Sequence, residues 1–295
     1  MISGQCSECG GRAGAPGAPS PAERQAANDA RASFAVVQPR PAPRQSIVAT
    51  ELRVAHLGRV GYAAAEGLQK ALVVRRQAGE IPDTLLLLEH DPVITLGRNA
   101  HAENVLHSAA ALGARGIEVT ECDRGGDVTY HGPGQIVGYP ILDLHSCPRP
   151  AFLPPRSGRL DLGPVDYVRA LEEVLIRAAA ACGVACKRLP GMTGVWTASE
   201  PANKLAAIGV HVARGVTSHG FALNVNNDLS GFDFIIPCGI RDHGVTSLRR
   251  ETGRSWDLGA IETILEGEFV EVFARVLVPA PDLWDDKKLA KLFGK

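Results

Sequence analysis

The chain has 295 residues, of which 45% are hydrophobic and 21% are charged, as in an ordinary globular protein. Its 31 lysines and arginines nearly balance 32 aspartates and glutamates, so whole-chain charge gives no reason to expect binding to nucleic acid or an anionic membrane. The sequence contains no long uncharged apolar run and does not begin with the basic and apolar pattern of a secretory signal. We therefore expect a cytoplasmic protein without a membrane segment.

The seven cysteines are odd in number and irregularly spaced, in a chain long enough to bury a core without disulfide bonds. This pattern indicates reduced thiols in a cytosol. Cys6 and Cys9 form a CxxC pair, but the next histidine or cysteine is His56. Because a structural zinc ion needs four ligands, we assign no metal site and no cofactor.

The amino-acid composition and the apolar pattern change near residue 49. Residues 1–48 are rich in Gly, Ala, Pro, Arg and Ser without apolar periodicity, which predicts a disordered extension. Residues 49–280 alternate between strand and helix patterns and are predicted to form one catalytic domain. Residues 281–295 form a charged tail.

Helix and strand patterns alternate along this domain. Apolar spacing predicts helices at 62–79, 104–116, 164–183 and within 258–276, with Val165, Val168, Leu171, Leu175 and Ala178 forming the apolar stripe of the third. Strand formers cluster at 51–58, 84–90, 92–97, 117–122, 194–199, 204–213 and 218–226, and the segment 127–144 is predicted to form two strands broken by a His-Gly-Pro-Gly turn. We expect a single α/β (α+β) domain, because the regular βαβ rhythm of a doubly wound fold is missing.

Three segments combine a reactive side chain with permissive glycines, and together they predict a site: Arg124–Gln135, Lys204–Val212 and Phe234–Ile240. In the same order, they resemble the octanoyltransferase family of lipoate biosynthesis, and the RGG, HGPGQ and YP block is highly specific for it. The resemblance extends from about Thr50 to Val278.

This resemblance implies a fold similar to the catalytic domain of biotin and lipoate ligases, with a mixed β-sheet flanked by helices. It implies transfer of an octanoyl group from octanoyl-acyl carrier protein to a lysine of a lipoyl domain, in 2-oxo acid dehydrogenases or the glycine cleavage H protein. The acyl group would pass through a thioester on Cys238, with Lys204 as its partner. Exchange of thioesters needs no ATP, and the sequence has no phosphate-binding loop.

The local sequence supports both catalytic assignments. Pro237 favours an extended residue before it and Gly239 frees the backbone after Cys238, so the thiol can sit on a turn with an N–H facing a developing oxyanion. Lys204 opens a strand that is apolar on both faces, which would desolvate its ammonium group. A free thiol is mostly protonated at neutral pH, so a lysine acting either as neutral base or as cationic partner would generate thiolate.

The resemblance also implies a substrate-binding wall. Arg124 would face the phosphopantetheine or the acidic surface of the carrier, and His131 would line the acyl thioester or assist proton transfer, although a tight turn and a core histidine are the structural alternatives. Ala207, Gly209, Gly220 and Ala222 are small enough for an acyl tunnel, or for tight strand packing. His211, His219 and His243 receive no catalytic role. The complete predicted wall is Arg124, Gly125, Gly126, Asp127, Val128, Thr129, Tyr130, His131, Ala207, Ile208, Gly209, Gly220, Phe221 and Ala222.

Three other functions remain open. An ATP-dependent lipoate or biotin ligase would share the fold but would not need Cys238. An amidotransferase between two lipoyl proteins would share the lysine and thiol chemistry and differ in its donor. A non-catalytic protein that docks carrier or lipoyl domains would bind without transfer.

Overall fold

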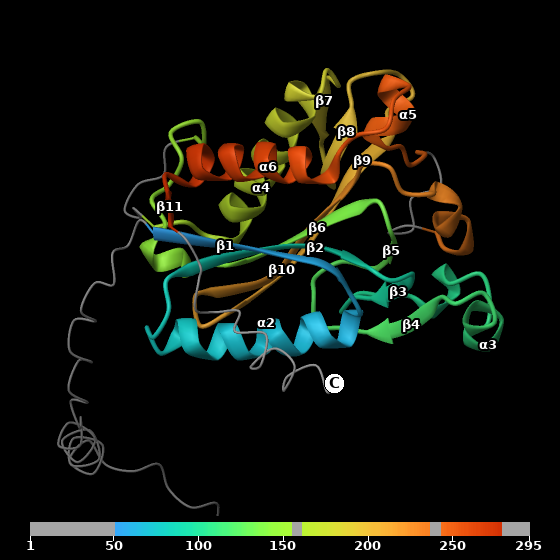
Figure 1. The fold of residues 1–295 in the computed structure, drawn as a ribbon, viewed down its shortest axis with the longest axis horizontal. Helices are drawn as coiled ribbons and strands as arrows, with labels where there is room; N and C mark the ends of the chain where they lie inside the picture. Colours follow the sequence, from blue (N-terminus) through green and yellow to red (C-terminus); the bar gives the residue numbers. More distant parts are fainter. Residues whose placement is uncertain (1–50, 155–160, 237–242, 279–295) are drawn as a thin grey trace, which may run out of the picture. The chain divides into compact units, whose positions relative to one another are not determined.

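The computed structural model describes residues 51–154, 161–236 and 243–278 (Figure 1). The predicted extension at 1–48, the predicted tail at 281–295 and the candidate nucleophile Cys238 lie outside these residues. None of the helices in the described ranges is both long and apolar enough to span a bilayer.

A large mixed sheet forms the centre of the described domain. Its eight strands lie in the order β11-β1-β2-β6-β10-β9-β8-β7, and β1 runs parallel to β2 and β11 while the other neighbouring pairs are antiparallel. This arrangement confirms the predicted mixed sheet. The strands are β1 (Glu51–Val60), β2 (Asp83–His90), β6 (Gln135–Ile141), β7 (Cys186–Leu189), β8 (Met192–Thr197), β9 (Lys204–Ala213), β10 (Val216–Asn224) and β11 (Val276–Val278).

Helices cover both faces of this sheet (Figure 1). Successive residues of β2 point to opposite faces of the sheet. Leu85 and Leu87 belong to the core under α4 (Pro164–Ala181) and α6 (Leu258–Phe273). Leu86 and Leu88 belong to the core under α2 (Tyr62–Gln77). Two short helices, α3 (Ala109–Gly113) and α5 (Leu248–Thr252), lie outside these layers. The 3₁₀ turns are η1 (Ala102–Asn104), η2 (Leu144–Ser146) and η3 (Leu229–Phe234).

The apolar stripe predicted for α4 is correct in its centre and wrong at its start. Leu171, Leu175 and Ala178 are fully buried, but Val165 is 63% exposed. Tyr167 and Val174 occupy the buried positions that complete the stripe. Val165 follows the first residue of the helix, where the chain still approaches the core, so helical periodicity alone misplaces it.

A second, three-stranded sheet carries the glycine-rich block. β3 (Val93–Leu96) lies between β4 (Glu118–Glu121) and β5 (Val128–His131). The His-Gly-Pro-Gly turn therefore passes the chain from β5 of the small sheet to β6 of the large one. Gly134 has a φ of 83°, and a Cβ there would lie 2.7 Å from the backbone nitrogen of Asn227, so only glycine fits this crossing.

A buried charge cluster links the start of β2 to two other segments. The carboxylate of Asp83 accepts hydrogen bonds from Arg275 and Arg76 at 2.8 Å each, and its side chain is only 2% exposed. It also accepts from the backbone N–H of Asp143 at 3.0 Å. These contacts tie α2, β2 and the chain after α6 together.

Replacing Asp83 with Asn should lower the free energy of unfolding by about 3 to 5 kcal/mol, because Arg275 would stay buried without its carboxylate. The matched control is Asp91→Asn, which breaks the Arg59–Asp91 pair, whose side chains are 51% and 59% exposed. That control should cost less than about 1 kcal/mol. Urea unfolding of the three proteins measures both values, and equal losses in the two variants would contradict the assignment.

Candidate active site

A cavity of about 410 Å³ brings two of the three predicted segments together, Arg124–Gln135 and Lys204–Val212. Its walls come from β5, β6, β8, β9 and β10, with contributions from α2, α4 and η3. The cavity is also lined by Phe232 and Val245, which lie six residues before and seven residues after Cys238 in the sequence. Twelve of the predicted residues line it: Arg124, Gly125, Gly126, Thr129, His131, Lys204, Ala207, Ile208, Gly209, Gly220, Phe221 and Ala222.

Lys204 is buried at the start of β9. Its side chain is 7% exposed, and its Nζ lies 4.9 Å from the centre of the Trp196 ring, within range of a cation–π interaction. Gly194 makes room for it, since a Cβ at that position would lie 2.9 Å from Lys204 Cε and 2.7 Å from Ala206 O. Desolvation of this lysine agrees with the sequence-based expectation, whereas Trp196 and Gly194 were missed.

The backbone of Lys204 is also joined to the chain that follows Cys238. Lys204 N–H donates to Gly244 O at 2.8 Å, and Thr246 N–H donates to Lys204 O at 2.9 Å. Gly244 follows Cys238 by six residues, so the chain shortly after the candidate nucleophile is hydrogen-bonded to the strand that carries the lysine.

Glycines allow the 124–126 segment to lie directly on β9. Gly125 N–H donates to Val210 O at 2.9 Å, and a Cβ on Gly209 would lie 2.8 Å from Gly125 O. On the neighbouring strand, a Cβ on Gly220 would lie 2.2 Å from Gly138 O. The small residues therefore serve both of the expected purposes, because they permit close backbone approach and they line the cavity.

Arg124 is buried within this wall. Its guanidinium group donates to Thr95 O at 2.6 Å and to Thr95 Oγ1 at 2.8 Å, and the residue is 7% exposed. Asp127 accepts from His101 N–H and the Asn104 amide. Val128 and Tyr130 pack in a separate apolar cluster behind β5. These last three predicted residues support the wall rather than line the cavity.

His131 is held as a neutral imidazole of defined tautomer. The Gln135 amide donates to Tyr130 O and Asn224 Oδ1, so its oxygen must accept the His131 Nδ1–H at 2.8 Å. Burial, reinforced by nearby His90, lowers the pKa of His131 to about 3. The bond therefore leaves Nε2 as the nitrogen with a lone pair.

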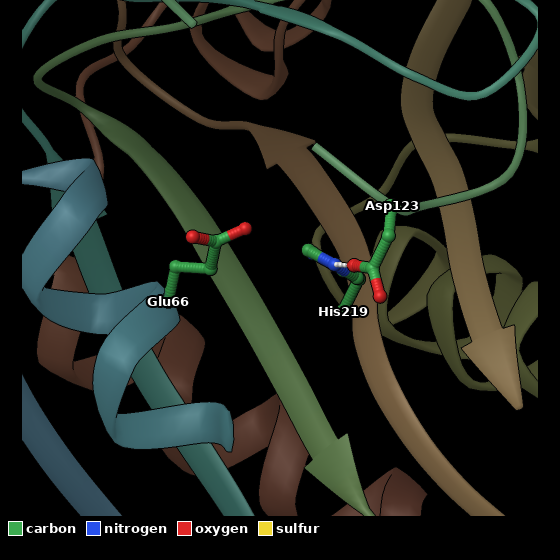
Figure 2. Close-up of side chains that lie close together, drawn as sticks. All are labelled: Glu66, Asp123 and His219. Atoms are coloured by element: carbon green, nitrogen blue, oxygen red, sulfur yellow. Dashed lines mark hydrogen bonds and ion pairs between the residues drawn. The ribbon is translucent and has the colours of Figure 1, made fainter. Parts of the chain in front are cut away.

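His219, to which the sequence assigned no role, also lines the cavity. Its φ is 55°, and its N–H donates to Gln69 Oε1 of α2 at 2.7 Å instead of continuing a strand ladder. Figure 2 shows its ring against the carboxylate of Asp123, with Nε2 2.6 Å from Oδ1. This pair ties the loop before Arg124 to β10. Periodicity gives no signal for it, because it depends on one left-handed residue.

The pKa shifts of the two groups favour an ionised Asp123 carboxylate and a neutral His219 ring. Burial lowers the pKa of His219, which favours a neutral ring that donates its Nε2–H. Partial burial is the largest single influence on Asp123 and raises its pKa, but the hydrogen bond and electrostatic attraction of His219, together with His211 and Arg98, outweigh it, so the pKa of that carboxyl is lowered. The Asp123 carboxylate therefore accepts from a neutral His219 near neutral pH.

Glu66 completes a group of three possible metal donors. The donor atoms of Glu66, Asp123 and His219 lie within 4.8 Å of one another, and Figure 2 shows the Glu66 carboxylate on the α2 side of the pair. Asp123 and His219 already bind each other, however, and Glu66 pairs with Lys70 at 2.8 Å. These partners explain the cluster as an ion-pair network.

Comparison with known proteins identifies the family. Residues 61–270 match the model of the lipoyl protein ligase A/B catalytic domain. The chain belongs to this family. An octanoyltransferase of Koribacter versatilis is 52% identical over 222 residues, covering 75% of this chain and 84% of the relative. One from Acidobacterium capsulatum is 57% identical over 203 residues, covering 68% and 80%. This member of the ligase A/B family is therefore an enzyme, an acyltransferase.

Solved structures of the family confirm the fold. A lipoate protein ligase from Thermoplasma acidophilum has a TM-score of 0.59 at 15% identity, covering 83% of this chain and 92% of the other. Lipoate-protein ligase A bound with ATP has a TM-score of 0.60 at 16% identity, covering 83% and 95%. The lipoate ligase-like architecture expected from the sequence is thus confirmed at the level of fold.

The neutral histidines should make the acyltransferase sensitive to acid. Burial lowers the pKa of His90 to about 4 and that of His131 to about 3, from 6.5. Below pH 6.5 these two histidines bind protons in the unfolded chain but not in the native state. Their contribution to the free energy of unfolding should therefore be fully present above pH 6.5 and should decrease as the pH falls towards 4. His131→Gln should reduce this slope by up to about 1.4 kcal/mol per pH unit in urea unfolding.

His101→Gln is the matched control, because its side chain is 68% exposed. It should leave the slope of wild type unchanged. An unaltered slope in His131→Gln would show that the cavity histidine does not titrate as its burial requires.

Proposed function

We propose that this acyltransferase moves an octanoyl group from octanoyl-acyl carrier protein to a lysine amine of a lipoyl domain, through a thioester on Cys238. The identity of 52% and 57% to two octanoyltransferases is the observation that carries the proposal. The burial of Lys204 in a cavity that is also lined by Phe232 and Val245, on either side of Cys238 in the sequence, supports the mechanism.

In the first step, the thiol of Cys238 loses its proton to Lys204 or to a base that Lys204 assists, and the thiolate attacks the carrier thioester. The bond between the acyl carbon and the carrier sulfur breaks, and the carrier thiol takes up a proton. The position of Lys204 beside the Trp196 ring suits a cation that must pair with thiolate in a desolvated cavity.

In the second step, the acceptor lysine attacks the Cys238 thioester as a neutral amine. An amide bond forms, the bond from carbon to Cys238 sulfur breaks, and the proton lost by the amine is taken up within the site. Lys204 can accept that proton, and His131, whose Nδ1–H is held by Gln135, can orient the amine through a hydrogen bond to Nε2. Conversion of a thioester into an amide is downhill, so no ATP is required.

The cavity walls suit a straight acyl chain. Val137, Ile208 and Phe221 contribute apolar surface, and Ala207 and Ala222 leave room between them. We assign as acceptors the lipoyl domains of 2-oxo acid dehydrogenases and the glycine cleavage H protein, and we place the reaction in the cytoplasm. The Thermoplasma ligase was described together with its E2 lipoyl domain, a precedent for this class of acceptor on the same fold.

Two enzymatic alternatives are separated by their donors. An ATP-dependent ligase would use a free acid and require ATP, whereas the proposed enzyme is active with octanoyl-acyl carrier protein alone. An amidotransferase would prefer an octanoylated lipoyl protein as donor. The names of the relatives favour the carrier-dependent reaction over both.

Incubation with octanoyl-acyl carrier protein, followed by peptide mass spectrometry, should place an octanoyl group on Cys238. Cys238→Ala should lower transfer by roughly a thousandfold or more, because the covalent route is lost. Lys204→Met should lower it by about 10²-fold to 10⁴-fold, the range of a proton-transfer group. The control Cys186→Ala, a half-buried thiol on β7 that does not line the described cavity, should keep wild-type transfer. Continued transfer with an unmodified Cys238 would refute the mechanism.

A further inference from the structure

A short, well-capped helix presents three exposed arginines next to the active site. In α5, Ser247 Oγ accepts from Arg250 N–H at 3.2 Å, and Gly253 closes the helix with a φ of 71°. Arg249 and Arg250 lie on this helix and Arg254 directly after it, and all three are exposed. We name these three residues the α5 arginine surface.

The charge of this surface is not neutralised by the described part of the chain. No carboxylate within the described ranges forms an ion pair with any of the three arginines, whereas Arg149, Arg177 and Arg188 all have one. Two acids of this region accept hydrogen bonds from hydroxyl groups instead: Glu251 from Thr246 Oγ1 at 2.5 Å and Asp228 from Ser230 Oγ at 2.7 Å.

Arg254 is held by stacking rather than by an ion pair. Its guanidinium carbon lies 3.8 Å from the centre of the Trp256 ring. Trp256 is fixed in turn by Asn226, whose side chain bonds both the N–H and the carbonyl of Trp256 at 3.0 and 2.7 Å. The guanidinium group of Arg254 therefore stacks on the Trp256 ring while the residue stays exposed.

The α5 arginine surface is one layer of residues away from the reaction cavity. Thr246 bonds to the Lys204 backbone, and its carbonyl accepts from Asn224, a residue that lines the cavity. On the outer side, a surface hollow is bounded by Asn227, Arg249 and Arg250. Asn227 connects the two sides, because its amide donates to Asn224 Oδ1 at 3.1 Å.

Among the described residues that line the cavity, none is a cation that reaches outward to an acidic protein. Arg124, which the sequence suggested for that contact, is 7% exposed and its guanidinium is directed to Thr95. An acyl group carried on a phosphopantetheine arm enters such a cavity while its carrier protein stays outside. The carrier and the phosphate of its arm are anionic, so the contact needs exposed positive charge within reach of the entrance.

We propose that the α5 arginine surface docks the anionic face of the acyl carrier protein that delivers the octanoyl group. The inference rests on the proposed function for its ligand, and it adds the place and the charges that recognise the donor. Arginine suits this task because its planar group pairs with carboxylates and phosphates in a bidentate way. Such contacts act mainly on the association rate and on donor choice.

The double variant Arg249→Glu/Arg250→Glu should weaken binding of fluorescently labelled octanoyl-acyl carrier protein tenfold or more, measured by anisotropy. Wild-type binding should weaken steeply with added salt, and the variant should lose most of that dependence. Transfer from the N-acetylcysteamine thioester of octanoate, which has no phosphate and no carrier, should stay at the wild-type rate. Arg75→Glu is the matched control, with a side chain 48% exposed on α2, and it should bind the carrier normally.

Several results would overturn the docking surface. Unchanged carrier binding would do so, as would equal losses with the carrier and the small thioester, which would place the arginines in the fold or the reaction. Weakened binding of a lipoyl domain, with carrier binding intact, would also exclude the donor role. If the wild-type protein transfers octanoyl from neither donor, the proposed function fails, whereas the binding measurement still decides the surface.

Discussion

The site depends on direct contact between two stretches of backbone. Gly125 donates to Val210 O at 2.9 Å, and the missing side chain of Gly209 lets Gly125 O lie where a Cβ would be 2.8 Å away. This contact fixes the glycine segment on β9 as the wall of a cavity whose other end holds Lys204. A side chain at Gly209 would push the wall away and open the cavity to water.

Around this contact, several buried polar groups are each satisfied by a partner. Arg124 is held by Thr95, His131 by Gln135, and Asp123 by His219. Burial lowers the pKa of His131 and of His219 and keeps both rings neutral, although their hydrogen bonds to Gln135 and Asp123 act in the opposite direction. Positive charge for an anionic donor lies outside, on α5, so recognition of the carrier and chemistry on its acyl group are assigned to different residues.

The sequence predicted which segments meet better than it predicted how they meet. Reactive residues beside glycines marked the segments, and the His-Gly-Pro-Gly turn marked a break between strands that belong to two different sheets. It did not reveal Trp196 beside Lys204. That contact joins two strands, and it depends on Gly194, which leaves space for the lysine side chain. His219 was missed for a similar reason, since one left-handed residue redirects a side chain that strand alternation would place elsewhere. Local patterns encode elements and turns, whereas these pairings depend on tertiary approach.

The central claim is that Lys204 promotes ionisation of the Cys238 thiol, and the pH dependence of Cys238 alkylation by iodoacetamide tests it most directly. Mass spectrometry of the Cys238 peptide gives the alkylation rate at each pH, independent of any acyl donor. The account predicts that the wild-type protein reaches its half-maximal rate at a clearly lower pH than Lys204→Met, because the lysine stabilises thiolate. Superimposable profiles for the two proteins would contradict it.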